Sequence, residues 1–277
     1  MQNDFKLRLK FWGVRGSTPT PQLENLGYGG NTSCLEVRSA GGELLILDGG
    51  TGIRNLGRSL VEEAARSDLS IHMLLTHFHW DHIQGIPFFA PLYFPRNSVT
   101  FYAFGDSGGP EKMLAGQMQS PYFPVDLHRA PANKEFVVID RTPLKFGDLS
   151  VYPFPLNHPQ GAFGYRFECE GASAVYATDL EHGHEELDKV LREHAQNADI
   201  LIYDAQYTPE EYESHKGWGH STWSEGARVA RESKVEELIL FHHDPGHDDR
   251  MCFEIIEKAQ GHFPRTLAAK ELWTVHL

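Results

Sequence analysis

A dense group of metal-ligating residue types lies at positions 76–82, where the sequence reads Thr-His-Phe-His-Trp-Asp-His. Three imidazoles and one carboxylate fall within six residues, directly after an apolar run. Zinc favours imidazole nitrogen, and manganese or iron also bind it when oxygen ligands are present. A turn after a strand can direct His77 and His79 towards one ion, and Asp81 and His82 towards a second. A solvated histidine-rich loop explains this spacing less well, so we expect a metal site here.

Short apolar runs end in polar residues in both halves of the chain. Runs of aliphatic and β-branched residues predict strands at 43–47, 71–75, 174–177, 199–203 and 237–241. The polar residues after these runs include Asp48, His77, Asp179, Asp204 and His242. Because α/β folds build their sites at the carboxyl ends of strands, these side chains are the candidates for a common site.

Helical segments alternate with the strands. We expect helices at 54–66, 185–197, 223–232 and 250–258, and Thr222 with Glu225 three residues later predicts a capping box for the third. The strands 164–168 and 174–178 flank Glu170-Gly171 and predict a hairpin. This alternation predicts an α/β fold with helices covering the sheets, and the lack of a linker predicts a single domain over residues 1–277.

The composition argues against several classes of function. The chain has 25 Lys and Arg against 38 Asp and Glu, so its net charge of −13 disfavours a protein that binds long nucleic acid or anionic membranes. The longest apolar stretch, 86–94, contains two prolines, and the N-terminus lacks a signal-peptide pattern. Three scattered cysteines are too few for a disulfide framework or a thiolate zinc site. We therefore expect no membrane association and a cytoplasmic location.

The pattern His-x-His-x-Asp-His after a strand resembles the metallo-β-lactamase-fold hydrolases, and the resemblance extends over nearly the whole chain. Asp48-Gly49-Gly50 is similar to the family's D-x-G segment, and His158 to its next histidine. Asp179 resembles the aspartate that bridges two metals, and His242 resembles the histidine that ends the last strand. The resemblance implies an αββα sandwich with two central mixed sheets flanked by helices. It also implies two divalent ions, zinc first, with manganese or iron as alternatives.

The resemblance also implies a distribution of ligands between two ions. One ion would be bound by His77, His79, His158 and Asp179, and the other by Asp81, His82, Asp179 and His242. We favour His242 over His243 because it directly follows the apolar strand. The remaining histidines without such context are expected to be structural or on the surface: His72, His128, His194, His215, His247, His262 and His276.

The segment Gly219-His220-Ser221-Thr222, together with Asp204, resembles the ribonuclease Z-like phosphodiesterase branch of this family. In that branch the histidine contacts the scissile phosphate and assists the leaving group, oriented by an acidic partner. The resemblance implies that His220 is this catalytic residue and Asp204 its partner, although ribonuclease Z usually has the larger Glu there. Asp81 would orient the nucleophile as well as hold a metal.

The substrate predicted from the sequence is a small phosphodiester. Enzymes that process tRNA carry a long arm between the third histidine and the bridging aspartate, whereas Asp179 follows His158 here by only 21 positions. The segments 11–19 and 29–34 resemble small bacterial and phage enzymes that act on cyclic phosphodiesters. We therefore expect hydrolysis of cyclic nucleotides, with phosphoribosyl cyclic phosphate or a ribonuclease Z-like activity as alternatives. The segment 104–132 is expected to be a cap or dimer-contact loop, so a homodimer is possible.

The sequence also offers aromatic residues that could contact a substrate, and the fold is compatible with other reactions. Phe88, Phe89, Tyr93 and Phe94 offer candidate surfaces for a base. The same fold also carries thioesterases and lactam hydrolases, which need no histidine at position 220. A metal-binding sensor without activity is disfavoured, because such a descendant would be free to lose ligands.

Overall fold

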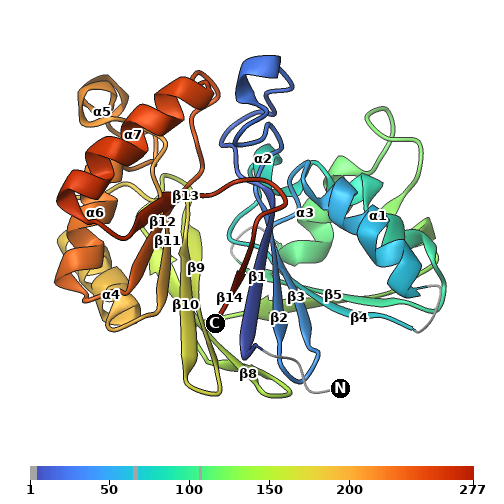
Figure 1. Ribbon diagram of the computed structural model, residues 1–277. Helices are drawn as coiled ribbons and strands as arrows, with labels where there is room; N and C mark the ends of the chain where they lie inside the picture. Colours follow the sequence, from blue (N-terminus) through green and yellow to red (C-terminus); the bar gives the residue numbers. More distant parts are fainter. Residues whose placement is uncertain (1–4, 65–67, 106–107) are drawn as a thin grey trace.

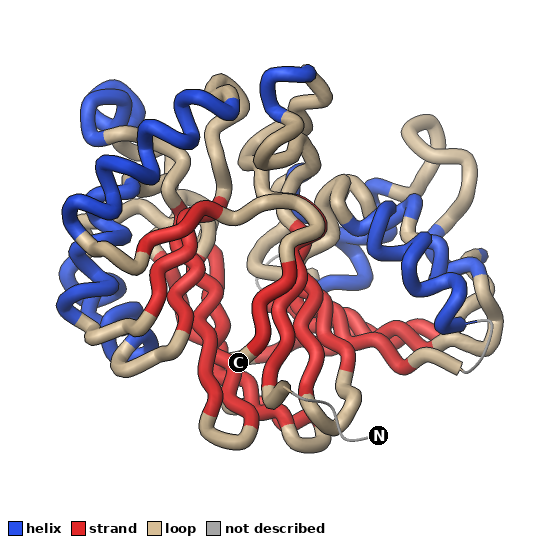
Figure 2. Tube along the Cα trace, in the orientation of Figure 1, coloured by secondary structure: helices blue, strands red, loops and turns tan. Residues whose placement is uncertain are grey.

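The computed structural model of the protein describes residues 5–64, 68–105 and 108–277. Within these residues, two seven-stranded sheets lie side by side in the centre of the molecule, and helices cover the outer face of each sheet (Figure 1). Figure 2 shows the same layering, with strands inside and helices outside. The predicted α/β fold, an αββα sandwich of two mixed sheets, is therefore confirmed.

The first sheet joins the two ends of the chain, because the C-terminal strand β14 pairs antiparallel with β1. The strands β1 to β3 are antiparallel neighbours, whereas β3 to β6 run parallel. In spatial order, this sheet contains β14 (Thr274–His276), β1 (Leu7–Gly13), β2 (Cys34–Ser39), β3 (Leu44–Leu47), β4 (Ser70–Leu74), β5 (Ser98–Phe104) and β6 (Asn133–Ile139).

The second sheet has the same mixed character. The strands from β10 to β13 are parallel, and those from β7 to β10 are antiparallel. Its strands β10 and β11 are buried along their whole length and are mostly apolar on both faces, with Ser173 and Asp204 as the polar exceptions. In spatial order, this sheet contains β13 (Thr266–Ala268), β12 (Glu237–Phe241), β11 (Ile200–Asp204), β10 (Ala172–Ala177), β9 (Ala162–Cys169), β8 (Leu149–Leu156) and β7 (Leu144–Phe146).

The helices bury apolar stripes against the sheets. In α1, for example, Ile53, Leu56 and Leu60 recur at helical spacing and are all buried. One hydrophobic core lies between the two sheets. A second core lies between the first sheet and its helices, and a third between the second sheet and its helices. The α-helices are α1 (Ile53–Ala64), α2 (Trp80–Ile83), α3 (Gly109–Gln117), α4 (Glu185–Ala195), α5 (Pro209–His215), α6 (Trp223–Glu232) and α7 (Asp249–His262). Short 3₁₀ turns are η1 (Leu23–Asn25), η2 (Ile86–Phe88), η3 (Ala90–Tyr93) and η4 (Leu127–Arg129).

Most predicted elements are present close to their expected bounds. The strand 237–241 and the helix 223–232 have the predicted bounds, and the predicted hairpin is formed by β9 and β10. Residues 65–66 of the predicted helix 54–66 lie outside the described residues. The capping prediction is correct in part: Thr222 accepts a hydrogen bond from the Glu225 amide, but the Glu225 carboxylate binds Arg228. A full capping box is formed by Thr208 and Glu211 at α5.

The segment 104–132 contributes to the core of the molecule. It contains α3 and η4, and Leu114, Met118 and Leu127 are fully buried in the cluster between the first sheet and its helices. Residues 106–107 of this segment lie outside the described residues. Nowhere in the described ranges is there a helix of the length and apolar character that crossing a membrane requires.

Candidate metal centre

Among the residues with a left-handed backbone conformation, three that follow strands belong to one polar cluster. Asp48 follows β3, Asp179 follows β10, and His242 follows β12, with φ values of 58°, 59° and 61°. This conformation is uncommon outside glycine and costs about 1–3 kcal/mol per residue, and such strain concentrates at functional sites. All three side chains meet at one polar cluster, where the carboxyl ends of the two sheets adjoin.

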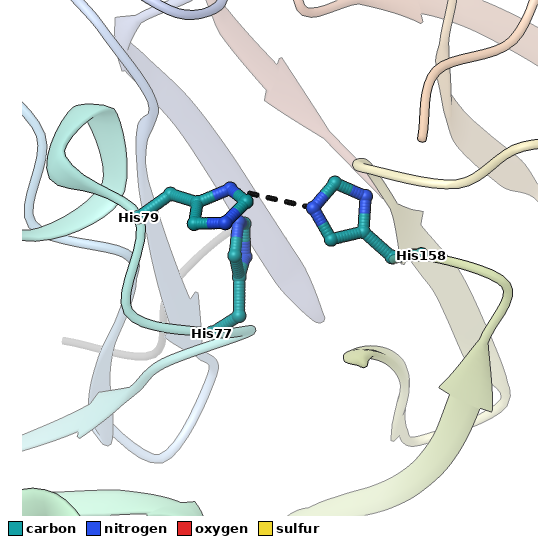
Figure 3. A group of neighbouring side chains, drawn as sticks. All are labelled: His77, His79 and His158. Atoms are coloured by element: carbon teal, nitrogen blue, oxygen red, sulfur yellow. Dashed lines mark hydrogen bonds between the residues drawn. The ribbon is translucent and has the colours of Figure 1, made fainter. Parts of the chain in front are cut away.

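The first group of potential metal ligands consists of His77, His79 and His158 (Figure 3). One ring nitrogen from each lies within 4.8 Å of the others. His77 and His79 come from the loop between β4 and α2, and His158 from the loop after β8. Figure 3 shows the rings of His79 and His158 facing each other, with 3.3 Å between Nδ1 of His79 and Nε2 of His158.

The second group consists of Asp81, His82, Asp179 and His242, all of them buried. Oδ2 of Asp179 lies 3.1 Å from Nε2 of His82 and 3.4 Å from Nε2 of His242. Oδ1 of the same carboxylate lies 3.8 Å from Nε2 of His77, in the first group. Asp179 therefore faces both groups. The structure thus brings together all seven residues that the sequence predicted as metal ligands.

The outer nitrogens of the imidazoles are fixed by oxygen acceptors. Nδ1 of His82 donates to Oδ2 of Asp48 at 2.9 Å, and Nδ1 of His158 donates to the carbonyl of Gly219 at 3.0 Å. Nδ1 of His242 donates to Oε1 of Gln206 at 3.0 Å. Because carboxylate and carbonyl oxygens only accept, the proton must sit on Nδ1, and Nε2 keeps its lone pair unless the ring is charged. This is the tautomer that binds a metal through Nε2.

The donor set fits two divalent metal ions. Nε2 of His77 and Nε2 of His82 are buried and have no hydrogen-bond partner among the described residues. Burial lowers the pKa of both His77 and His158, so these imidazoles are neutral, the form that ligates metals. Burial raises the pKa of Asp81, but His82 and His242 hold it well below its usual range, so the carboxylate is ionised. Nitrogen and oxygen donors in this mixture suit zinc, manganese or iron.

The predicted pair of His220 and Asp204 lies beside these groups. Nδ1 of His220 donates to Oδ2 of Asp204 at 3.0 Å, and both residues are buried. Burial lowers the pKa of His220, but the charge and hydrogen bond of Asp204 outweigh it and raise the pKa to about 9. The ring of His220 lies 5.8 Å from that of His158 and 4.9 Å from that of His242. His220 belongs to neither of the two predicted ligand sets, but it stands next to one residue of each. With Asp204, Asp179 and His242 it forms a third group whose potential ligand atoms lie within 4.8 Å of one another.

Sequence reasoning missed the residues that orient these ligands. Gln206 accepts from His242 through Oε1, and its Nε2 donates to Asp244 at 3.3 Å, which fixes the direction of the amide. Glu181 accepts from the amides of Gly217 and Gly219 and so holds the turn whose carbonyl binds His158. Gly219 has φ of +88°, and a Cβ there would lie 2.3 Å from Nδ1 of His158. The sequence signal for this turn was the Gly-His-Ser-Thr segment, whereas no local signal marked Gln206.

The side chains of the adjacent residues His242 and His243 point in different directions, and only one of them faces the candidate ligands. His242 faces the second group, whereas Nε2 of His243 donates to the carbonyl of Ala269 at 3.0 Å. Burial, followed by the charge of Arg15, lowers the pKa of His243 to about 3, so it is a neutral structural histidine. The structure thus places His242, not His243, among the candidate ligands.

Comparison with protein families identifies a match over most of the chain. The family model described as "Beta-lactamase superfamily domain" matches residues 45–243. Among curated proteins, the chain is similar to ribonuclease Z of Bradyrhizobium sp. (strain ORS 278), with 26% identity over 95% of this chain and 97% of the relative. It is also 25% identical to ribonuclease Z of Pyrococcus horikoshii, over 94% of this chain and 93% of that protein.

Solved structures share the fold over the whole chain. The metallo-β-lactamase fold protein YhfI from Bacillus subtilis superimposes with a TM-score of 0.74 at 17% identity, covering 98% of this chain and 99% of YhfI. A diphosphatase of the PhnP family gives a TM-score of 0.69 at 19% identity, covering 98% of both chains. The short form of human tRNase Z gives 0.64 at 18% identity, covering 97% of this chain and 98% of that one.

The orientation of His242 by Gln206 predicts a loss of metal affinity on substitution. Gln206→Leu removes the acceptor of the Nδ1 proton, so His242 can rotate or change tautomer, and affinity for the ion that His242 would hold should fall about 10–100-fold. Competition of the metal-loaded protein against a chelator of known affinity measures this loss. The exposed Gln119→Leu is the matched control and should retain wild-type affinity. Equal affinities in the two variants would remove Gln206 from the support of the site.

Proposed function

The chain belongs to the β-lactamase superfamily, and on this premise we propose that it is a dinuclear-metal-dependent phosphodiesterase acting on small cyclic phosphodiesters, cyclic nucleotides first. A metal-dependent hydrolase of phosphodiester bonds is what the ribonuclease Z relatives and the ligand cluster both support. The observation that carries the proposal is the pair of His220 and Asp204 beside that cluster. A lactam or thioester hydrolase on this fold has no need for such a pair.

The ligand groups divide between two ions, with Asp179 common to both. His77, His79 and His158 would hold the first ion, and Asp81, His82 and His242 the second. Two divalent ions bound there would supply charge that stabilises an in-line displacement at phosphorus and would activate a water molecule as the nucleophile. The imidazoles of His82, His158 and His242 contribute by directing Nε2 into the cluster, because their Nδ1 atoms are held by oxygen acceptors. Zinc is the metal we propose first, because imidazole donors predominate.

Asp81 is placed to orient the attacking water. Its Oδ2 accepts from the amide of Ser17 at 2.8 Å and lies 3.2 Å from Nε2 of His242. The residue is 5% exposed, so its carboxylate is held in one orientation within the site. A carboxylate fixed in this way accepts a hydrogen bond from water and directs its lone pair towards the substrate.

His220 is proposed to donate a proton to the leaving oxygen. Its Nδ1–H is committed to Asp204, so Nε2 is the atom that can face the substrate. Asp204 itself is fixed, because Oδ2 also accepts from the Asp179 amide and Oδ1 from the amides of Gln206 and Ser221. A general acid held within reach of the leaving group lowers the barrier to its departure.

The segment between His158 and Asp179 supports a small substrate. Every residue there is described, and the segment is filled by β9 and β10, which belong to the second sheet. No arm for a large RNA extends from it, and the net charge of −13 opposes extended phosphate contacts. Ribonuclease Z activity is the second candidate, because the curated relatives of that name match the chain over nearly its full length.

A cytoplasmic location is part of the proposal. The cysteines Cys34, Cys169 and Cys252 are buried and free of disulfides, as expected in a reducing compartment.

The substrate class is tested by a panel assayed with the metal-loaded protein. We expect turnover of 2′,3′- or 3′,5′-cyclic nucleotides and of bis(p-nitrophenyl) phosphate, and none of nitrocefin or an acyl thioester. Cleavage of a precursor tRNA without hydrolysis of any cyclic nucleotide would replace the first candidate with the second. Turnover of nitrocefin or the thioester alone would contradict both.

Metal analysis tests the dinuclear arrangement. The seven residues of the two predicted ligand sets exceed what a single tetrahedral ion uses, so the purified protein should bind two ions per chain. Asp179→Asn should lower the occupancy of both ions, since this carboxylate faces both groups. A stoichiometry of one that persists after supplementation with zinc or manganese would contradict the assignment.

The role of His220 predicts a dependence on the leaving group. His220→Ala should lower turnover of a cyclic nucleotide by about 10²–10⁴-fold while two ions stay bound. The loss should be much smaller with bis(p-nitrophenyl) phosphate, because p-nitrophenolate needs little protonation. Asp204→Asn should show a milder form of the same pattern, and the exposed His128→Ala serves as the control. Loss of metal, or an equal slowing of both substrates, would show that His220 is not the general acid.

A further inference from the structure

A pocket of about 300 Å³ adjoins the first group of histidines. His77, His79 and Thr76 line one side of it, so the pocket and the candidate metal centre share a wall. The opposite walls are apolar and consist of Phe78, Ala103, Phe104, Met113 and Phe163. Its volume is at the lower end of the range for small-molecule sites, which is enough for one ring system and too small for an oligonucleotide.

The walls of this pocket come from both halves of the molecule. Phe104 ends β5 in the first sheet, and Phe163 lies in β9 of the second sheet, and their rings are stacked almost parallel. The Phe163 amide also donates to the carbonyl of Thr76 at 3.1 Å, which ties this wall to the loop that carries His77. Strands and a backbone hydrogen bond therefore hold the aromatic wall in a fixed position relative to the ligand cluster.

The polarity of the pocket defines what it can bind. None of its lining side chains is an acid, a lysine or an arginine, so nothing there would pair with a second phosphate. Its one flexible polar side chain is Gln160, whose Oε1 accepts from Nε2 of His79 at 3.1 Å. The Gln160 amide nitrogen has no hydrogen-bond partner among the described residues and remains a donor. A neutral aromatic ring with an acceptor on its edge satisfies both the walls and this donor.

From these contacts we propose that the pocket is a nucleobase subsite, which binds the base of a nucleotide while its phosphate lies at the histidine and aspartate cluster. The proposal rests on the proposed phosphodiesterase function and names its substrate as a nucleotide. Aromatic side chains bind bases by stacking with little sequence preference. The four aromatic residues at positions 88–94 do not contribute to this pocket: Phe89 is fully buried, and none of them lines it.

Direct binding tests the subsite without relying on turnover. Isothermal titration of the metal-loaded protein with AMP and with ribose 5-phosphate compares ligands that differ only in the base. AMP should bind about 10-fold more tightly or better. Phe163→Leu should remove most of this advantage and leave the affinity for ribose 5-phosphate unchanged. The matched control is Phe253→Leu, on the exposed face of α7, which should behave as wild type. Equal affinity of the wild-type protein for the two ligands would overturn the proposal.

Hydrolysis separates failure of the subsite from failure of the proposed function. The substrates are a cyclic nucleotide and glycerol 1,2-cyclic phosphate, which lacks a base. The expected result is a KM about 10-fold lower for the nucleotide, an advantage that Phe163→Leu abolishes with little change in kcat. If both substrates are hydrolysed with the same KM, the subsite is wrong and the phosphodiesterase stands. If AMP binds through Phe163 but no phosphodiester is hydrolysed, the subsite stands and the proposed function is wrong.

Discussion

The burial of carboxylates at one point is the constraint on which the rest of the structure depends. Asp48, Asp81, Asp179 and Asp204 are each at most 5% exposed, and all four belong to one hydrogen-bonded cluster. Several buried negative charges at short range destabilise a fold strongly unless cations or hydrogen bonds compensate them. Imidazoles and backbone amides compensate in part, and Nε2 atoms without partners remain directed into the cluster. Bound metal cations would supply the compensation that this arrangement lacks.

The backbone supports the cluster from the ends of strands in both sheets. Asp48 comes from the first sheet, whereas Asp179 and His242 come from the second, and each residue adopts a left-handed conformation at about 1–3 kcal/mol. The core between the sheets, built from the inner faces of both, fixes their relative position and offsets that strain. Because ligands of each predicted ion come from both halves, the packing of the two sheets and the geometry of the site are not independent.

The parts of this architecture that depend on local patterns could be predicted from the sequence. The strand 237–241 is marked by a short apolar run, and the helix 223–232 by its helical periodicity and its N-terminal cap. The motif at 77–82 is marked by the specific spacing of its histidines and aspartate. Gln206 and the aromatic wall could not be predicted, because they act through contacts between segments distant in sequence. Phe104 and Phe163 are ordinary strand residues until the two sheets adjoin. The aromatic residues at 88–94, predicted as a surface for a base, do not line the pocket either. Whether such a side chain is exposed, and where it points, depends on tertiary packing, which the local sequence does not reveal.

Electrostatics connects the proposed substrate to the net charge of −13. Of the four buried aspartates, Asp48 is paired with His82 and Asp204 with His220. Two divalent ions would more than neutralise the remaining pair, Asp81 and Asp179, so the centre itself would attract a phosphate although the protein carries a net negative charge. This attraction is local, since mobile ions screen exposed charges beyond about 8 Å at physiological ionic strength. A long RNA would bring further phosphates to a protein of net negative charge, which offers them little electrostatic attraction. The proposed cyclic nucleotide would place its single charge at the cluster, and its neutral base would lie in the adjoining pocket, which no acid, lysine or arginine lines.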